Sequence, residues 1–166
     1  YGGRVVKTLG DGLLAEFPSA VDAVRCAADV QVALAGAETG VPADRRIELR
    51  IGINIGDVII GSGDIHGDGV NVAARLQAEA PAGGILVSQG VRETASGLSQ
   101  FAFDDRGEMR LKNIARPVRA YVLRAAAARA PSRQTRVRRW RHWGAAAAVS
   151  ILAGAGIWLA IAETGR

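Results

Sequence analysis

Residues 63–76 read Gly-Asp-Ile-His-Gly-Asp-Gly-Val-Asn-Val-Ala-Ala-Arg-Leu, a glycine-rich stretch that runs directly into a helical pattern. The glycines allow the backbone of the expected loop to approach a ligand closely. Asn71 and Arg75 are four residues apart, so their side chains project from one face of a helix. An amide and a guanidinium on one face suit a phosphate-bearing substrate. The pattern predicts a helix from about residue 67 to residue 80, which ends at Pro81.

The stretches on both sides of this helix have the patterns of strands. Apolar and other residues alternate over residues 47–53, which predicts a strand with one buried face, and residues 58–60 are expected to pair with it as a hairpin. Two earlier apolar runs flank Gly10-Asp11-Gly12 and predict another hairpin. The remaining expected elements are strands at residues 5–9, 13–17, 85–87, 101–111 and 120–123, and helices from about 19 to 34 and from 88 to 96. This order predicts an α+β domain, with helices packed on a largely antiparallel sheet.

Charge is distributed unevenly along the 166 residues. Residues 1–128 hold 14 Lys and Arg against 15 Asp and Glu, whereas residues 129–166 hold 7 Arg against 1 Glu. The high isoelectric point therefore comes from the tail, and the folded part does not have the composition of a nucleic-acid binder. The single cysteine, Cys26, cannot form an internal disulfide, which is compatible with a reducing compartment.

An Ala- and Arg-rich linker is expected over residues 125–142, followed by twenty residues without a formal charge, 143–162, and a short tail, 163–166. Twenty helical residues span roughly 30 Å, the thickness of a hydrocarbon core, so the segment is a candidate transmembrane helix. A buried or interfacial helix is the alternative, because the segment is rich in Ala and Gly. Arginines before the segment favour a cytoplasmic location for the folded part, in a single-pass protein of the inner or plasma membrane.

The first hairpin adds Lys7 and Asp11 to the candidate residues. A carboxylate at the tip of a glycine-flanked turn is well placed to bind a hard cation such as Mg²⁺, which prefers oxygen ligands. Gly10-Asp11-Gly12 is equally compatible with a plain hairpin turn.

Taken together, these motifs closely resemble the catalytic domain of class III adenylate/guanylate cyclases. The resemblance rests on residues 2–12, 50–56 and 64–76, continues through 83–88, 111–114, 117–118 and Tyr121, and assigns residues 1–124 to that domain. It implies a palm-type, ferredoxin-like α+β fold. It also implies a homodimer that converts ATP to 3′,5′-cyclic AMP and pyrophosphate with two Mg²⁺ or Mn²⁺ ions per site, for intracellular signalling.

The resemblance also implies a role for each candidate residue. Asp11 would bind metal, and Lys7 with Asp64 would read the purine edge, in a combination that resembles adenylate rather than guanylate cyclases. Adenine offers an N1 acceptor and an N6 donor, which a lysine and a carboxylate complement. Asn71 would orient the ribose, Arg75 would stabilise charge on the α-phosphate in the transition state, and Lys112 would contact the terminal phosphates. No role is assigned to His66, and Asp68 is expected to help cap the helix.

One departure from the family concerns its first strand, which carries another metal-binding aspartate. The chain begins at Tyr1, after the place where that strand belongs, so we expect a missing upstream segment, a sheet without its central strand, and a fragment that is inactive alone. A catalytically inactive, membrane-anchored module that binds nucleotide or a partner is the alternative function. A diguanylate cyclase lacks support, because the chain contains no Gly-Gly-Asp/Glu-Glu-Phe run.

Overall fold

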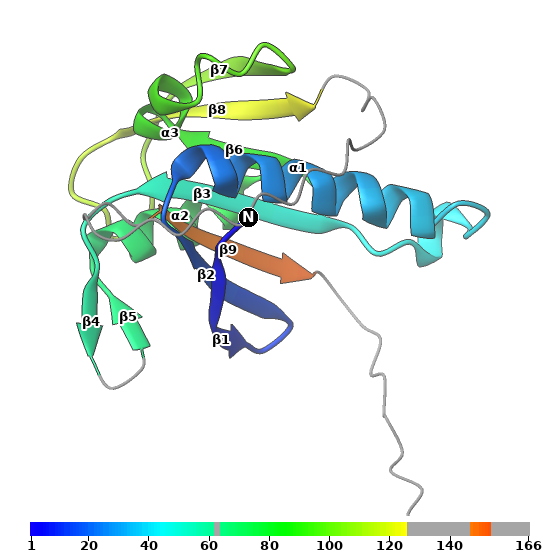
Figure 1. The fold of residues 1–166 in the computed structure, drawn as a ribbon, viewed down its shortest axis with the longest axis horizontal. Coiled ribbons are helices and arrows are strands. Elements are labelled where there is room, and N and C mark those ends of the chain that lie inside the picture. The colour runs from blue at the N-terminus through cyan, green and yellow to red at the C-terminus, as the bar shows by residue number, and fades with distance from the viewer. Residues whose placement is uncertain (62–63, 126–146, 154–166) are drawn as a thin grey trace, which may run out of the picture.

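The computed structural model describes residues 1–61, 64–125 and 147–153. Within them, three α-helices cover the two faces of a mixed seven-stranded sheet, and a two-stranded sheet stands beside it (Figure 1). The elements are β1 (Arg4–Leu9), β2 (Gly12–Phe17), α1 (Ala20–Ala37), a 3₁₀ turn (Ala43–Arg45), β3 (Leu49–Ile55), β4 (Ile59–Gly61), β5 (Asp64–His66), α2 (Asp68–Glu79), β6 (Ile85–Ser88), α3 (Gln89–Thr94), β7 (Phe101–Met109), β8 (Val118–Ala125) and β9 (Ala147–Ala153).

The strand order in the large sheet is β1-β2-β9-β3-β6-β8-β7. β3 and β6 are parallel, and the other neighbouring strands of this sheet are antiparallel. The connection from β3 to β6 contains β4, β5 and α2, as a parallel pair requires a long crossover. The prediction of an α+β fold with a largely antiparallel sheet and packed helices is therefore confirmed.

The helices α1 and α3 pack on one face of this sheet. Ala23 and Val24 of α1 join Ile51 and Ile53 of β3 and Val91 of α3 in one buried cluster. Alternate residues of a strand point to opposite faces, so β3 presents its isoleucines to this core. This cluster is the larger part of the hydrophobic core.

Helix α2 covers the opposite face of β3. A Cβ atom on Gly52 would lie 2.3 Å from the carbonyl oxygen of Ala73 and 2.3 Å from the backbone nitrogen of Gln77, so a side chain at this position would push α2 away. Asn54 is buried on the same face. The prediction that this strand has one buried face is therefore wrong, because glycine allows the helix to cover the second face as well.

The predicted hairpin between residues 47–53 and 58–60 is also wrong. β4 pairs with β5 instead, with Ile60 opposite Ile65. Both edges of β3 are already paired, one with β9 and the other with β6, so β3 has no free edge for β4.

The prediction of a transmembrane helix over residues 143–162 is wrong for residues 147–153, which form strand β9. β9 lies between β2 and β3 and is antiparallel to both (Figure 1). A strand in this position pairs the backbone groups of two edges that would otherwise be open. The expected gap in the centre of the sheet is therefore filled by the chain itself.

The composition of β9 suits this place. Positions 149 and 151 are in register with Ile53 and Ile51 of β3. The sequence supplies Val and Ile there, and β-branched residues fit the pleated surface of a sheet. The apolar character of residues 147–153 was thus compatible with either a helix or a strand.

The rest of the predicted membrane segment, most of the linker and the tail lie outside the described residues. Across residues 1–61, 64–125 and 147–153, no helix has the length and apolar character needed to cross a bilayer. Membrane location and cytoplasmic orientation stay predictions.

Candidate active site

A small apolar cluster brings together three of the elements that carry candidate residues. Leu14, Ile65 and Ala73 are its buried members, and Val6 and Val70 pack against it. The cluster therefore joins β1 and β2 to β5 and to the first half of α2, on the face of the sheet opposite α1. Lys7, Asp64 and Asn71 each directly adjoin one of these anchoring residues in sequence.

A β-bulge determines the face on which Lys7 lies. Val5 is in register with Ala15, but Lys7 is in register with Leu14, so the pairing shifts between these two positions. In a regular ladder Lys7 would be opposite Leu13, and a shift of one residue moves a side chain to the other face. The bulge therefore puts the half-buried Lys7 on the α2 face.

Strand β5, which begins with Asp64, contacts both β1 and α2. The backbone of Asp64 pairs with Gly61, and the side chain of Asp64 lies outside the described atoms. The strands that carry Lys7 and Asp64 are therefore in contact, although they belong to different sheets.

Asn71 and Arg75 lie on α2, as the sequence predicts. Asn71 is exposed and Arg75 is partly buried, so both side chains have access to a ligand on this side of the molecule. The helix begins after Gly67, whose φ of +138° favours glycine, and the Asn71 N–H donates to the Gly67 carbonyl at 3.2 Å. Asp68 is the first helical residue, and no side chain caps this helix.

Lys112 lies in the turn between β7 and β8. Its neighbour Leu111 is buried in a cluster with Leu76, the residue that follows Arg75 on α2. Asn113 has a φ of +63°, which fixes the tight turn after Lys112. The exposed Lys112 therefore projects from a segment that is packed against α2.

Asp11 lies at the other end of the sheet. Gly12, the next residue, is in register with Leu152, which is in register with Arg50 near the start of β3. The first turn of α2 accepts a hydrogen bond from Asn54. Asn54 is four residues beyond Arg50 on β3, a separation of roughly 13 Å along a strand. One copy of the chain therefore does not bring Asp11 to the N-terminus of α2.

The turn of Asp11 fits the role of a single metal ligand. Asp11 is exposed beside Gly10, whose φ is +61°. Mg²⁺ is commonly held by one or two carboxylates together with water and substrate phosphates. In the part of the chain that the structure describes, no three His, Cys, Asp or Glu residues gather as a metal site.

Sequence reasoning missed Asn54. Its amide nitrogen Nδ2 donates to the carbonyl oxygen of Gly69 at 3.0 Å, and the residue is only 7% exposed. The alternation of the strand had suggested a solvent-facing position. A signal was available in the sequence, because an uncharged amide between Gly52 and Gly56 suits a covered face.

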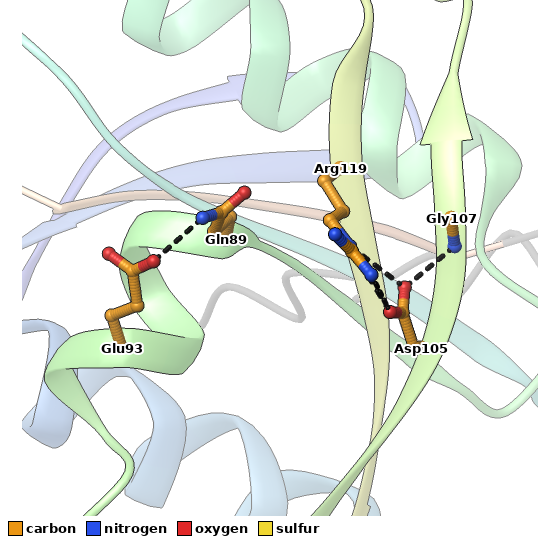
Figure 2. A network of polar contacts seen from close by, with 5 residues as sticks. All are labelled: Gln89, Glu93, Asp105, Gly107 and Arg119. Carbon is orange, nitrogen blue, oxygen red and sulfur yellow. Dashed lines mark hydrogen bonds and ion pairs between the residues drawn. The ribbon is translucent and has the colours of Figure 1, made fainter.

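Figure 2 shows polar contacts within α3 and between β7 and β8, and none of the residues drawn is a candidate residue. Arg119 Nε donates to Asp105 Oδ2 at 3.1 Å, and the Gly107 N–H donates to Asp105 Oδ1 at 2.8 Å, across a bulge in the edge strand β7. The Arg119 guanidinium, followed by the Gly107 N–H, holds the pKa of the Asp105 carboxyl below its ordinary value. These contacts stabilise the pairing of the edge strand.

A cavity of about 610 Å³ lies at the C-terminal part of α1, beside the starts of β3 and β6. Ala28, Val32 and Ile47 contribute to its apolar lining, and Glu38, Arg46 and Glu48 contribute charge. None of the candidate residues lines it.

A family model described as the adenylate and guanylate cyclase catalytic domain matches residues 1–125. The chain belongs to this family. The cyclase domain is 50% identical over 120 residues to the putative adenylate cyclase 3 of Rhizobium meliloti (strain 1021). This match covers 72% of the chain and 20% of that relative. It is 40% identical over 92 residues to an adenylate cyclase of Streptomyces coelicolor, and this match covers 55% of the chain and 23% of that relative.

A solved structure supports the same fold. The crystal structure of an adenylate/guanylate cyclase/hydrolase from Silicibacter pomeroyi matches with a TM-score of 0.70 and 47% identity, over 74% of this chain and 72% of that chain. The chain spans about a fifth of the length of the two curated relatives above.

Proposed function

We propose that this cyclase domain belongs to an adenylate cyclase that converts ATP to 3′,5′-cyclic AMP and pyrophosphate at sites shared between two copies of the chain. The observation that supports this proposal is the β-bulge, which turns Lys7 to the α2 face, together with the contact between β1 and β5, the strand that begins with Asp64. The names of the two curated relatives support ATP as the substrate.

The chemistry of adenine favours this pair of residues. The Lys7 ammonium can donate to N1 of adenine, and the Asp64 carboxylate can accept from the N6 amino group. Guanine has a donor at N1 and an acceptor at O6, so the same pair would meet donor against donor and acceptor against acceptor. The domain should therefore discriminate against GTP.

The other candidate residues fit the steps of the reaction. The ribose 3′ oxygen attacks the α-phosphorus, the bond to the bridging oxygen of the β-phosphate breaks, pyrophosphate leaves, and the hydroxyl proton is released. Asn71 would hold the ribose so that the 3′ oxygen faces the α-phosphate. Arg75 would stabilise the charge that develops on the α-phosphate, and Lys112 would hold the terminal phosphates.

Two divalent ions per site, Mg²⁺ or Mn²⁺, would neutralise the triphosphate and favour ionisation of the 3′ hydroxyl. Asp11 would supply one of their ligands. Because Asp11 and the start of α2 lie at opposite ends of one sheet, the Asp11 that serves a given Asn71 and Arg75 would come from the second copy. A symmetric dimer would then contain two equivalent sites.

The direct test is to measure cyclic AMP and cyclic GMP formation by the intact protein with ATP or GTP, with Mg²⁺ or Mn²⁺. We expect cyclic AMP from ATP and little product from GTP. Lys7→Ala should raise KM for ATP and reduce the preference over GTP, whereas Lys112→Ala should raise KM for both. Absence of turnover with either nucleotide would leave only a binding function.

A mixing experiment tests the shared site. Asp11→Ala and Arg75→Ala should each abolish activity. In an equilibrated equimolar mixture, half of the dimers would be mixed and would have one intact site each, so activity should return to about a quarter of the wild-type value. A mixture as inactive as its components would show that both residues act within one copy.

A further inference from the structure

Asn54 joins the middle of the sheet to the start of the helix that carries the catalytic candidates. Its side chain is buried, and its Nδ2 donates to the Gly69 carbonyl oxygen at 3.0 Å. Gly69 is in the first turn of α2, two residues before Asn71. The hydrogen bond therefore links β3 directly to the end of α2 from which Asn71 projects.

Close backbone contacts at glycines fix the distance between β3 and α2. A Cβ atom on Gly69 would lie 3.0 Å from the Cα of Gly56, and one on Gly52 would meet the backbone of Ala73 and Gln77 at 2.3 Å. These contacts stop α2 from moving closer to β3. The Asn54 hydrogen bond opposes movement away from β3 or along it, because either would stretch a buried bond whose acceptor is a helix carbonyl.

We propose that Asn54 is a positioning residue for the cyclase reaction, and that it acts through Gly69 by holding α2, and thereby Asn71 and Arg75, in place against the sheet. Asn54 itself does not touch the nucleotide. The inference rests on the proposed function, because it assigns Asn71 and Arg75 to catalysis. A helix moves as one body, so a small shift at Gly69 displaces both side chains.

Two substitutions test this role. Asn54→Ala removes the donor. Asn54→Asp keeps the shape but replaces the amide donor by a carboxyl group, which when ionised can only accept, so its effect should grow as the pH rises through the pKa of that carboxyl. A displacement of about 1 Å can cost on the order of 10²-fold in rate, so we expect kcat to fall by about 10- to 100-fold in both variants, with a smaller change in KM for ATP. The isosteric variant keeps the test available if Asn54→Ala does not fold.

The chain offers a matched control in Gln31→Ala. Gln31 also uses a side-chain amide to join a helix to β3. Its Nε2 donates to the backbone carbonyl oxygen of Leu49 at 2.9 Å, which connects α1 to β3. This bond lies at the other end of β3 and holds α1 rather than α2. Loss of it should lower thermal stability by an amount similar to that in Asn54→Ala, but leave kcat within about twofold of wild type.

Hydrogen exchange gives a readout that does not depend on activity. The Asn71 N–H, which donates to Gly67 O, should exchange faster in Asn54→Ala than in wild type and should be unchanged in Gln31→Ala. If wild type forms cyclic AMP and Asn54→Ala matches Gln31→Ala in kcat, the positioning role is wrong and the proposed function stands. If wild type forms no cyclic nucleotide, the proposed function fails, and unchanged exchange at Asn71 would separately exclude control of α2 by Asn54.

Discussion

Gly56 and Gly69 are so close that a Cβ atom on Gly56 would lie 2.7 Å from the Cα of Gly69. The end of β3 and the start of α2 thus meet backbone to backbone, without side chains between them. Any side chain at Gly56 would force the two elements apart, since the atom that it meets is main chain.

We predict that Gly56→Ala lowers the free energy of unfolding by about 1–3 kcal/mol, as overpacking of a core contact does. Gly36→Ala in α1 is the control, because a Cβ atom there meets nothing within 4 Å. An alanine in a helix should stabilise the protein by up to about 1 kcal/mol relative to glycine. Urea unfolding of both variants measures the two values, and equal effects of the same sign would contradict this packing.

The place of β9 predicts a specific cross-link. Ile53 and Val149 are in register on neighbouring antiparallel strands, where Cα atoms are about 4.5–5.5 Å apart, a distance that a disulfide spans. Cysteines at these two positions, in a Cys26→Ala background, should form an intramolecular disulfide under mild oxidation. Faster migration on a non-reducing gel and loss of both free thiols would report it.

The control pair is Ile53→Cys with Ile151→Cys, because position 151 is in register with Ile51 rather than with Ile53. Diagonal neighbours on one face are about 7–8 Å apart, too far for an unstrained disulfide. Equal cross-linking of both pairs, or of neither, would contradict the register of β9. Protection of the thiol at position 149 by lipid vesicles, without cross-linking, would favour the transmembrane helix that the sequence predicted.

The lowered pKa of Asp105 predicts a pH dependence. Its pKa is held below 3.8 mainly by Arg119, so the unfolded state takes up protons at a higher pH than the folded state does. The stabilisation from this carboxylate is present above pH 3.8 and is lost as the pH falls through the lowered folded value. NMR titration of Arg119→Gln should show the pKa of Asp105 moving back towards 3.8. Arg4→Gln, which removes the separate pair with Glu16, should leave it unchanged.

The sequence predicted local elements well where periodicity and turn residues agreed. The first hairpin, α1 and α2 follow from turn glycines and apolar spacing, and the structure has all three, although no side chain caps the start of α1 or α2. Long-range pairing could not be predicted in the same way. A strand can pair only with a strand that has a free edge. β4 pairs with β5 because both edges of β3 are already paired.

The candidate site was predicted in part. The positions of Asn71 and Arg75 on one helix follow from their spacing alone. The face on which Lys7 lies depends on a β-bulge between Val5 and Lys7. The sequence pattern does not predict this bulge, because Val6 is an ordinary residue for a regular strand. Asn54 was missed because its role depends on a helix that covers a strand face, and this packing is a tertiary property.

Arg75→Lys should separate charge from geometry at the proposed transition state. Both side chains are cationic, but only the guanidinium can donate two parallel hydrogen bonds to phosphate oxygens. Because Arg75 is only partly buried on α2, we expect the unfolding midpoint to stay near that of wild type. If Arg75 acts chiefly on the transition state, kcat and kcat/KM should fall together, by about 10²-fold, with KM for ATP nearly constant. Arg25→Lys on α1, which pairs only weakly with Asp22, is the control and should change none of these values. A rise in KM at constant kcat would instead show that Arg75 binds the ground state and that the charge of the transition state is stabilised elsewhere.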